Sequence, residues 1–140
     1  MIVLDTNVLS ETLRPEPDAH ALKWLAAQPR AALFTTTVTR GELLYGVRLL
    51  AESKRKSSLL AAVRAIFDQD LAGQVLSFDS DAADAYAEIA ASRKTAGKPI
   101  SQFDAVIAAI ARSRGASLAT RNVKDFAQCG IDVIDPWRKA

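Results

Sequence analysis

The first seven residues, Met1 to Asn7, constrain the fold more than any other part of this 140-residue sequence. Residues 1–4 are all apolar, and the run ends on a carboxylate, Asp5, followed by the small polar residue Thr6. A strand whose successive residues are all apolar is covered on both faces, which is typical of parallel sheets packed between helices. Ligands of such sheets bind beyond the carboxyl ends of the strands, so Asp5 is the first candidate for a functional residue.

Further along the chain, short strand-like runs alternate with stretches of helical periodicity. Strands are predicted at residues 32–36, 75–78, 116–120 and 132–134, and helices at residues 19–27, 39–51, 59–71, 80–97, 101–111 and 123–127. The polar residues 54–58 are interpreted as a break between two helices. The run 105–111 is apolar nearly all round, so its helix is predicted to be the most buried. The alternation indicates an α/β fold, a three-layer sandwich with a central parallel sheet of about five strands flanked by helices.

Composition narrows the class of protein further. The length suits one compact domain, and we expect residues 1–140 to form it because no linker or repeat interrupts the chain. A formal charge of +2 does not by itself establish nucleic-acid binding. The single Cys129 excludes an intramolecular disulfide framework and a cysteine zinc site. We expect a cytoplasmic protein without membrane association, because no apolar stretch is long enough to cross a bilayer and no signal peptide is apparent.

Three acidic residues occupy equivalent places in this predicted layout. Asp5 ends the first strand, Glu42 lies in the first turn predicted after the second strand, and Asp104 lies in the first turn of the buried helix. In a parallel α/β fold, strand carboxyl ends and the first turns of the following helices lie on one edge of the sheet. We therefore expect the three carboxylates to approach one another. Their repulsion would raise their pKa values or require a hard divalent cation such as Mg²⁺.

Each acid also has a purely structural interpretation. Thr39-x-x-Glu42 and Ser101-x-x-Asp104 match the capping box or its Asp relative, in which the acid satisfies a free backbone amide at a helix start. Taken singly, Glu42 and Asp104 fit a capping role better than a catalytic one. Asp5 is less easily explained in this way, because the chain after it does not resemble a regular helix start, although it could order the following turn by local hydrogen bonds.

A fourth acid follows the fourth predicted strand. Asp125 comes shortly after Thr120, Arg121 and Asn122, so this segment is placed to approach the same edge of the sheet. The structural alternative for Asp125 is a surface acid on a short helix.

Four ordered segments resemble the PIN-domain toxins, above all the VapC group with its FitB-like members. They are I-V-L-D-T-N-V-L-S at residues 2–10, T-x-T-x-x-x-G-E-L-x-x-G at 35–46, F-D-A-V-I-A-A at 103–109 and L-A-T-R-N-V-K-D-F at 118–126. The resemblance extends over essentially the whole chain. It implies a PIN-like fold and a Mg²⁺- or Mn²⁺-dependent endoribonuclease, the toxin of a type II toxin-antitoxin pair.

The resemblance also assigns roles to individual residues. By position, the acids of the family fall on Asp5, Glu42 and Asp104, which would hold one or two ions that polarise the phosphodiester and activate water. Many members carry a further Asp where this chain has Asn122, whose carbonyl oxygen can bind a metal but which removes one negative charge. Asp125 is the candidate to compensate. Residues expected to support the carboxylates or contact the RNA are Thr6, Asn7, Thr120, Arg121 and Asn122.

Partners follow from the same resemblance. Members of the family typically form homodimers and are blocked by a cognate antitoxin, VapB-like or FitA-like and encoded nearby, that lies across an apolar groove. Operator DNA would be bound only through that antitoxin. The predicted helices offer apolar residues for such a groove, although burial in the core is their default explanation. These residues are Leu43, Leu44, Val47, Leu60 and Val63.

Two other functions are compatible with parts of the sequence. A haloacid-dehalogenase-like phosphatase also begins with an apolar strand ending in a nucleophilic Asp, but its usual second Asp two residues later is Asn7 here. A non-catalytic α/β binding module would use the acids only as helix caps. A covalent phosphate on Asp5 would identify the phosphatase. Absence of both divalent-cation binding and nuclease activity would favour the binding module.

Overall fold

The computed structural model describes residues 1–138 and contains a five-stranded sheet in the order β3-β2-β1-β4-β5. All four neighbouring pairs are parallel. The central strand β1 is buried on both faces, with Val3 and Leu4 shielded from solvent. The predicted parallel α/β sandwich is therefore confirmed. The strands are β1 (Ile2–Leu4), β2 (Leu33–Thr36), β3 (Val75–Leu76), β4 (Ser117–Ala119) and β5 (Val133–Ile134).

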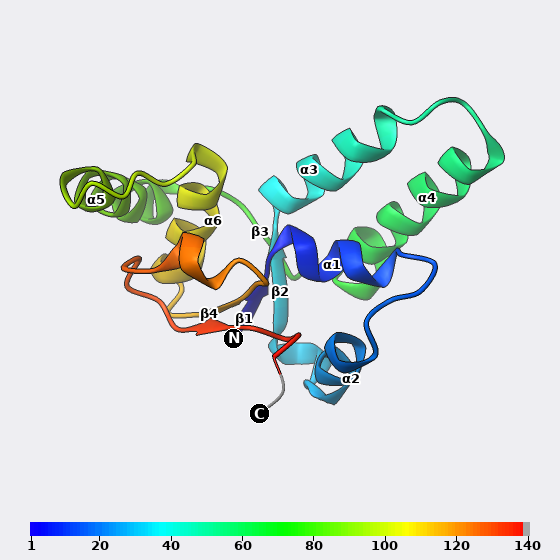
Figure 1. The fold of residues 1–140 in the computed structure, drawn as a ribbon, viewed down its shortest axis with the longest axis horizontal. Helices are drawn as coiled ribbons and strands as arrows, with labels where there is room; N and C mark the ends of the chain where they lie inside the picture. The colour runs from blue at the N-terminus through cyan, green and yellow to red at the C-terminus, as the bar shows by residue number, and fades with distance from the viewer. Residues whose placement is uncertain (139–140) are drawn as a thin grey trace.

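Helices cover both faces of this sheet and form the two outer layers (Figure 1). Helices α5 and α6 lie on one side, whereas α1, α2, α3 and α4 lie on the other. The helices are α1 (Thr6–Thr12), α2 (Ala19–Ala27), α3 (Thr37–Arg48), α4 (Lys54–Ala65), α5 (Ser80–Thr95) and α6 (Gln102–Ser113). Shorter helical turns are η1 (Arg30–Ala32), η2 (Ile66–Asp70) and η3 (Val123–Phe126).

Alternating residues of the central strands serve the two cores. Val3 and Leu118 pack into the cluster beneath α5 and α6, while Leu4 and Ala119 belong to the cluster beneath α1, α3 and α4. Successive strand side chains point to opposite faces, so a short apolar strand between two helical layers can fill both. Helix α6 buries six of its residues, as its apolar run predicted. No helix in residues 1–138 is long and apolar enough to cross a membrane.

The predicted polar break at residues 54–58 is wrong, because these residues form the first turns of α4. The helix begins after Ser53, whose hydroxyl accepts a hydrogen bond from the Lys56 amide at 3.1 Å. Lys and Arg are good helix formers and leave one face of the helix in water, so a charged run does not by itself end a helix. The predicted helix 59–71 also divides, since Ile66–Asp70 forms a π-helical turn after α4.

Candidate active site at the carboxyl edge of the sheet

Asp5 follows β1 directly and caps the first helix. Its Oδ1 accepts a hydrogen bond from the Thr6 amide at 2.8 Å, and its Oδ2 accepts one from the Thr120 hydroxyl at 2.7 Å. Only 5% of the residue is exposed. The expectation that no regular helix starts after Asp5 is therefore wrong, because α1 begins at Thr6 with Asp5 as its N-cap. The capping role leaves the second carboxylate oxygen for contacts across the sheet edge.

The environment of Asp5 disfavours its charged form. Burial raises the pKa of this carboxyl from 3.8 to about 6, against the opposing effect of the hydrogen bonds from Thr120 and Thr6. The negative charges of Asp104 and Glu42 raise the pKa of Asp5 further. Residues separated by about 100 positions in the sequence thus act on one another electrostatically at this edge. A cation at the site would relieve that repulsion.

Glu42 belongs to α3 and is tied to the first helix. The Thr6 hydroxyl donates to Glu42 Oε1 at 2.7 Å and lies 3.1 Å from the Thr39 hydroxyl. The predicted capping box of Thr39 and Glu42 is wrong, because α3 begins at Thr37 and its cap is Thr36, which accepts from the Thr39 amide at 3.1 Å. Glu42 therefore lies in the second turn, where it is not needed as a cap.

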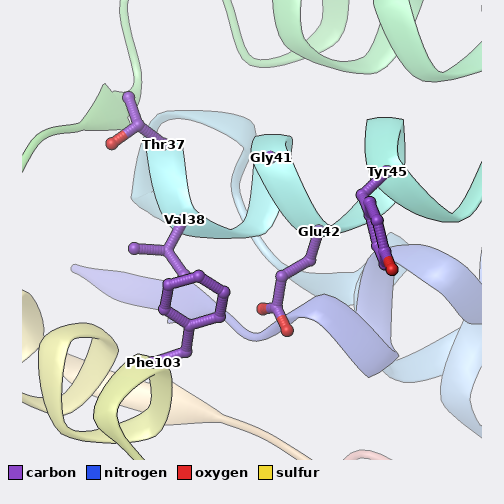
Figure 2. A pocket seen from close by; sticks show the side chains of 6 residues that line it. All are labelled: Thr37, Val38, Gly41, Glu42, Tyr45 and Phe103. Carbon is purple, nitrogen blue, oxygen red and sulfur yellow. The ribbon is translucent and has the colours of Figure 1, made fainter. Parts of the chain in front are cut away.

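The half-buried Glu42 side chain borders an apolar hollow (Figure 2). Its carboxylate lies between two aromatic side chains, Phe103 from the start of α6 and Tyr45 from α3. These aromatic residues are 57% and 66% exposed. The hollow has a volume of about 740 Å³ and is also lined by Thr37, Val38 and Gly41. The acidic site therefore borders an uncovered apolar surface on its α3 side.

Asp104 lies in the first turn of α6, as predicted. The helix is capped by Ser101, whose hydroxyl accepts from the Asp104 amide at 3.3 Å. Burial raises the pKa of the Asp104 carboxyl and the charge of Asp125 raises it further, while Ser101 and the guanidinium of Arg93 act in the opposite direction. Asp104 and Asp125 line one small polar hollow together. The structure therefore places Asp125 beside Asp104.

The segment after β4 supports Asp5. The Thr120 hydroxyl, which donates to Asp5, also accepts from Asn7 Nδ2 at 3.3 Å and from the Asn122 amide at 3.1 Å. The Arg121 amide donates to Asn7 Oδ1 at 3.2 Å. The exposed Arg121 guanidinium lies over the Trp137 ring, 5.2 Å from its centre. These contacts lock the β4–η3 connection against the start of α1.

Sequence reasoning missed Arg93, which is buried between α5 and the segment that contains η3. An arginine in the last turn of a helix is usually exposed and complements the helix dipole, so nothing in the local pattern signals burial. Its guanidinium binds backbone carbonyl groups, which carry no sequence signature.

The donor chemistry of the edge suits a hard divalent cation. Within residues 1–138, no three His, Cys, Asp or Glu side chains are grouped closely enough to form a complete ligand set. Mg²⁺ usually keeps several waters and binds through only one or two carboxylates. Asp5 and Asp104 supply carboxylate oxygens at one edge, and the charge of Asp104 acts unfavourably on ionised Asp5, so these donors fit such a partly hydrated ion.

Comparison with known proteins identifies the class of this fold and site. The PIN domain family model matches residues 2–130, and the chain belongs to the PIN-domain family. It is similar to a VapC ribonuclease of Sinorhizobium fredii, with 41% identity over 100% of both chains. It is also similar to toxin FitB of Neisseria gonorrhoeae, with 37% identity over 98% of this chain and 99% of FitB. The resemblance to the VapC group and its FitB-like members, predicted from four motifs, is confirmed.

The fold agrees with the same group. A chain in the solved structure of FitAB bound to a DNA fragment superposes with a TM-score of 0.94. That chain is 36% identical, and the match covers 100% of this chain and 98% of the other.

Proposed function

We propose that this protein is a Mg²⁺- or Mn²⁺-dependent endoribonuclease and the toxin component of a type II toxin-antitoxin system, acting in the cytoplasm. The observation that carries the proposal is the buried Asp5 carboxyl, whose pKa is raised to about 6 beside the charges of Glu42 and Asp104. Perturbed carboxyls that gather at the carboxyl edge of a parallel sheet favour a catalytic site. The similarity to a VapC ribonuclease and to toxin FitB supports RNA as the substrate.

The residues at the carboxyl edge of the sheet would have different roles in hydrolysis. A bound Mg²⁺ or Mn²⁺ would polarise the phosphodiester and lower the pKa of an attacking water. Asp5 and Asp104 would hold the ion, and Glu42 would complete the acidic set. The hydrogen bonds from Thr120 and Thr6 lower the pKa of Asp5 and so favour the ionised form that binds a cation. Thr6 fixes Glu42 through its hydrogen bond to Oε1.

In this proposal two residues together replace the fourth acid that many members of the family carry. Asn122 would offer a carbonyl oxygen without charge, whereas the exposed Asp125 would supply the missing negative charge from the Asp104 side. Both lie close to the edge, since the Asn122 amide donates to Thr120 and Asp125 lines the same hollow as Asp104. Arg121 and Asn7 would contact the substrate or support these groups.

We further propose that a FitA-like or VapB-like antitoxin covers the groove between α1, α3 and α4. This groove has a volume of about 440 Å³, and its lining includes Leu43, Val47 and Val63 as well as Glu42. An apolar segment lying in it would approach the acidic site. Operator DNA would be reached only through the antitoxin, in keeping with the similarity to FitAB bound to DNA.

A second copy of the chain is proposed to cover the hollow beside Phe103 and Tyr45. Exposed aromatic side chains at the rim of an apolar hollow favour a protein interface. The resulting homodimer would bury these rings beside the acidic site.

The test is expression of the wild-type protein and of Asp5→Asn without the antitoxin, followed by mapping of RNA 5′ ends. Wild type is expected to arrest growth and produce discrete cuts, and the purified protein to cleave the same RNA only with Mg²⁺ or Mn²⁺. Asp5→Asn should abolish cleavage while preserving the fold, because Asn still caps α1. Asp81→Asn, which alters an exposed acid in the first turn of α5, is the matched control.

Two outcomes would contradict the proposal. Unchanged cleavage by a folded Asp5→Asn variant would remove Asp5 from the mechanism. A wild-type protein that neither binds Mn²⁺ nor cuts RNA would favour the non-catalytic binding module.

A further inference from the structure

Arg93 is a buried cation whose side chain contacts three main-chain carbonyl groups. It lies in the last turn of α5 and only 6% of it is exposed. Its Nε donates to the Lys98 carbonyl at 2.7 Å, and its Nη1 donates to the carbonyls of Asp125 and Ala127 at 2.9 Å each. These carbonyls belong to two segments far apart in sequence. The guanidinium therefore cross-links the α5–α6 connection to the segment around η3.

The first segment leads directly into the helix that carries Asp104. Lys98 returns the contact, since its amide donates to the Arg93 carbonyl at 2.9 Å, so this residue pair is joined at two points. Three residues later, Ser101 caps α6 by accepting from the Asp104 amide. The position of the Lys98 carbonyl thus helps to set where α6 begins and where Asp104 lies.

The second segment carries Asp125. Arg93 binds the carbonyl of Asp125 itself and that of Ala127, while the Cys129 sulfur lies 3.7 Å from Nη1. Burial raises the pKa of the Cys129 thiol, so this sulfur stays uncharged and does not neutralise the guanidinium. A hollow of about 200 Å³ is lined by residues of both segments, and its lining includes Arg93, Asp104 and Asp125.

We propose that Arg93 is a positioning residue that fixes the spacing between the Asp104 and Asp125 carboxylates, and through that spacing the affinity of the site for a divalent cation. The inference rests on the proposed function. Arg93 also places one positive charge near two acids that repel each other, which limits their repulsion when no cation is bound. Its hydrogen bonds are made to main-chain atoms, so the carboxylate oxygens are left for ligands.

The planar guanidinium is needed because one side chain must reach carbonyls on both segments. Arginine presents donors in a rigid fork, whereas the compact ammonium of lysine cannot match that geometry. Arg93→Lys therefore keeps the charge and removes the cross-link. Residues that orient metal ligands typically change metal affinity or activity by roughly 10- to 100-fold when they are replaced.

The experiment compares wild type, Arg93→Lys and Arg112→Lys. Arg112 is a matched arginine on α6, more exposed and paired with Glu88 at 2.7 Å. Mn²⁺ affinity is measured by calorimetry on metal-free protein, and kcat and KM are measured on an RNA oligonucleotide that spans a mapped cut. Arg93→Lys should lower Mn²⁺ affinity and kcat by roughly 10- to 100-fold and leave KM nearly unchanged, because Arg93 does not contact the RNA in this proposal. Arg112→Lys should match wild type.

A folded Arg93→Lys variant with wild-type Mn²⁺ affinity and kcat would overturn the inference, even if its melting temperature were lower. That result would leave the proposed function intact as long as wild type cuts RNA and Asp5→Asn does not. An inactive wild type that binds no Mn²⁺ would instead overturn the proposed function.

Hydrogen exchange in the wild-type protein gives a second test that does not depend on whether a variant folds. If Arg93 couples the two segments, adding Mn²⁺ slows amide exchange at residues 96–101 and at 125–129 together. Protection confined to one of these segments would contradict the coupling.

Discussion

Asp5 and Asp104 lie at the same edge of the sheet, yet the protein holds them by different means. Asp5 is buried and receives hydrogen bonds on both carboxylate oxygens, from the Thr6 amide and the Thr120 hydroxyl. Asp104 is half-buried and is positioned through its backbone, by the cap at Ser101. Side-chain hydrogen bonds fix a carboxylate directly, whereas backbone contacts fix only the segment that carries it. The Asp5 carboxylate, on the β1 side, is therefore already oriented for a ligand. The orientation of the Asp104 carboxylate, on the α6 side, depends on the segments that pack around the start of α6.

The largest expected difference is between the losses of kcat caused by replacing Asp104 and by replacing Asp125. Asp104→Asn should lower kcat on the order of 10²–10³-fold, because it removes a charge that is proposed to hold the cation. Asp125→Asn should lower kcat only about tenfold, because an exposed acid is expected to act through water. Mn²⁺-dependent cleavage of one RNA oligonucleotide measures both. Equal losses in the two variants would place Asp125 in direct contact with the ion.

The next prediction concerns the stability of the metal-free protein. The pKa of Asp5 is about 6 in the folded protein and 3.8 in the unfolded chain. Between pH 3.8 and about pH 6 the folded protein therefore holds a proton on Asp5 that the unfolded chain has lost. The stabilisation that comes from protonated Asp5 is therefore fully present only below the unfolded pKa of 3.8 and is lost as the pH rises through about 6. Asp5→Asn should therefore increase the free energy of unfolding by on the order of 2–3 kcal/mol at pH 7.5.

Urea denaturation in EDTA at pH 7.5 and pH 3.5 measures this difference. The gain should almost disappear at the lower pH, where Asp5 is protonated in the folded state and mostly protonated in the unfolded state. Asp81→Asn removes an exposed charge from the first turn of α5 and should lower the free energy of unfolding at pH 7.5 by at most about 1 kcal/mol, opposite in sign to the effect at Asp5. A variant destabilised at pH 7.5 would show that the charged Asp5 is favoured in the fold.

Thr120 tests the hydrogen bonds that distinguish the β1 side. Thr120→Val should lower the free energy of unfolding by about 1–2 kcal/mol, because the Asn7 side-chain amide and the Asn122 amide lose their acceptor. It should also raise the pKa of Asp5 and move the acid limb of the cleavage profile to higher pH. Thr120→Ser keeps the hydroxyl and serves as the control. Identical profiles for Val and Ser would contradict the proposed support of Asp5.

The smallest expected effect comes from Asn122→Asp, which adds a charge at the proposed fourth position. Mn²⁺ affinity should rise several-fold, since more negative ligands strengthen binding of a hard cation. The same change should partly restore the Asp125→Asn variant, because either acid would supply the missing charge. Calorimetry on the two single variants and the double variant measures this coupling. Strictly additive effects would show that the two positions act independently.

Much of the fold could be predicted from local pattern. The strands at residues 32–36, 116–120 and 132–134 were expected because their composition and apolar content differ from the flanking helices, and the buried α6 was expected from its run 105–111. The start of α4 was missed because a charged run carries the same composition in a loop and in an exposed helical turn.

The site also has features that the local sequence predicted and features that it did not. The cap at Ser101 was visible locally, because a capping residue and its helix are adjacent in sequence. The capping role of Asp5 was missed, since α1 follows β1 without any intervening turn residue. The hydrogen bond from Thr6 to Glu42 joins α1 to α3, so no spacing within the sequence predicts it.

The sequence by itself determined the parallel α/β class and the acids that stand at strand and helix ends, because burial periodicity and helix starts are local properties. Its ordered motifs also pointed to the PIN-domain family. Only the tertiary structure decided that Asp5 is buried with a raised pKa, that Asp125 lies beside Asp104 and that Arg93 joins their two segments. Those properties depend on groups brought together from distant parts of the chain, where burial and charge act through space and not along the sequence.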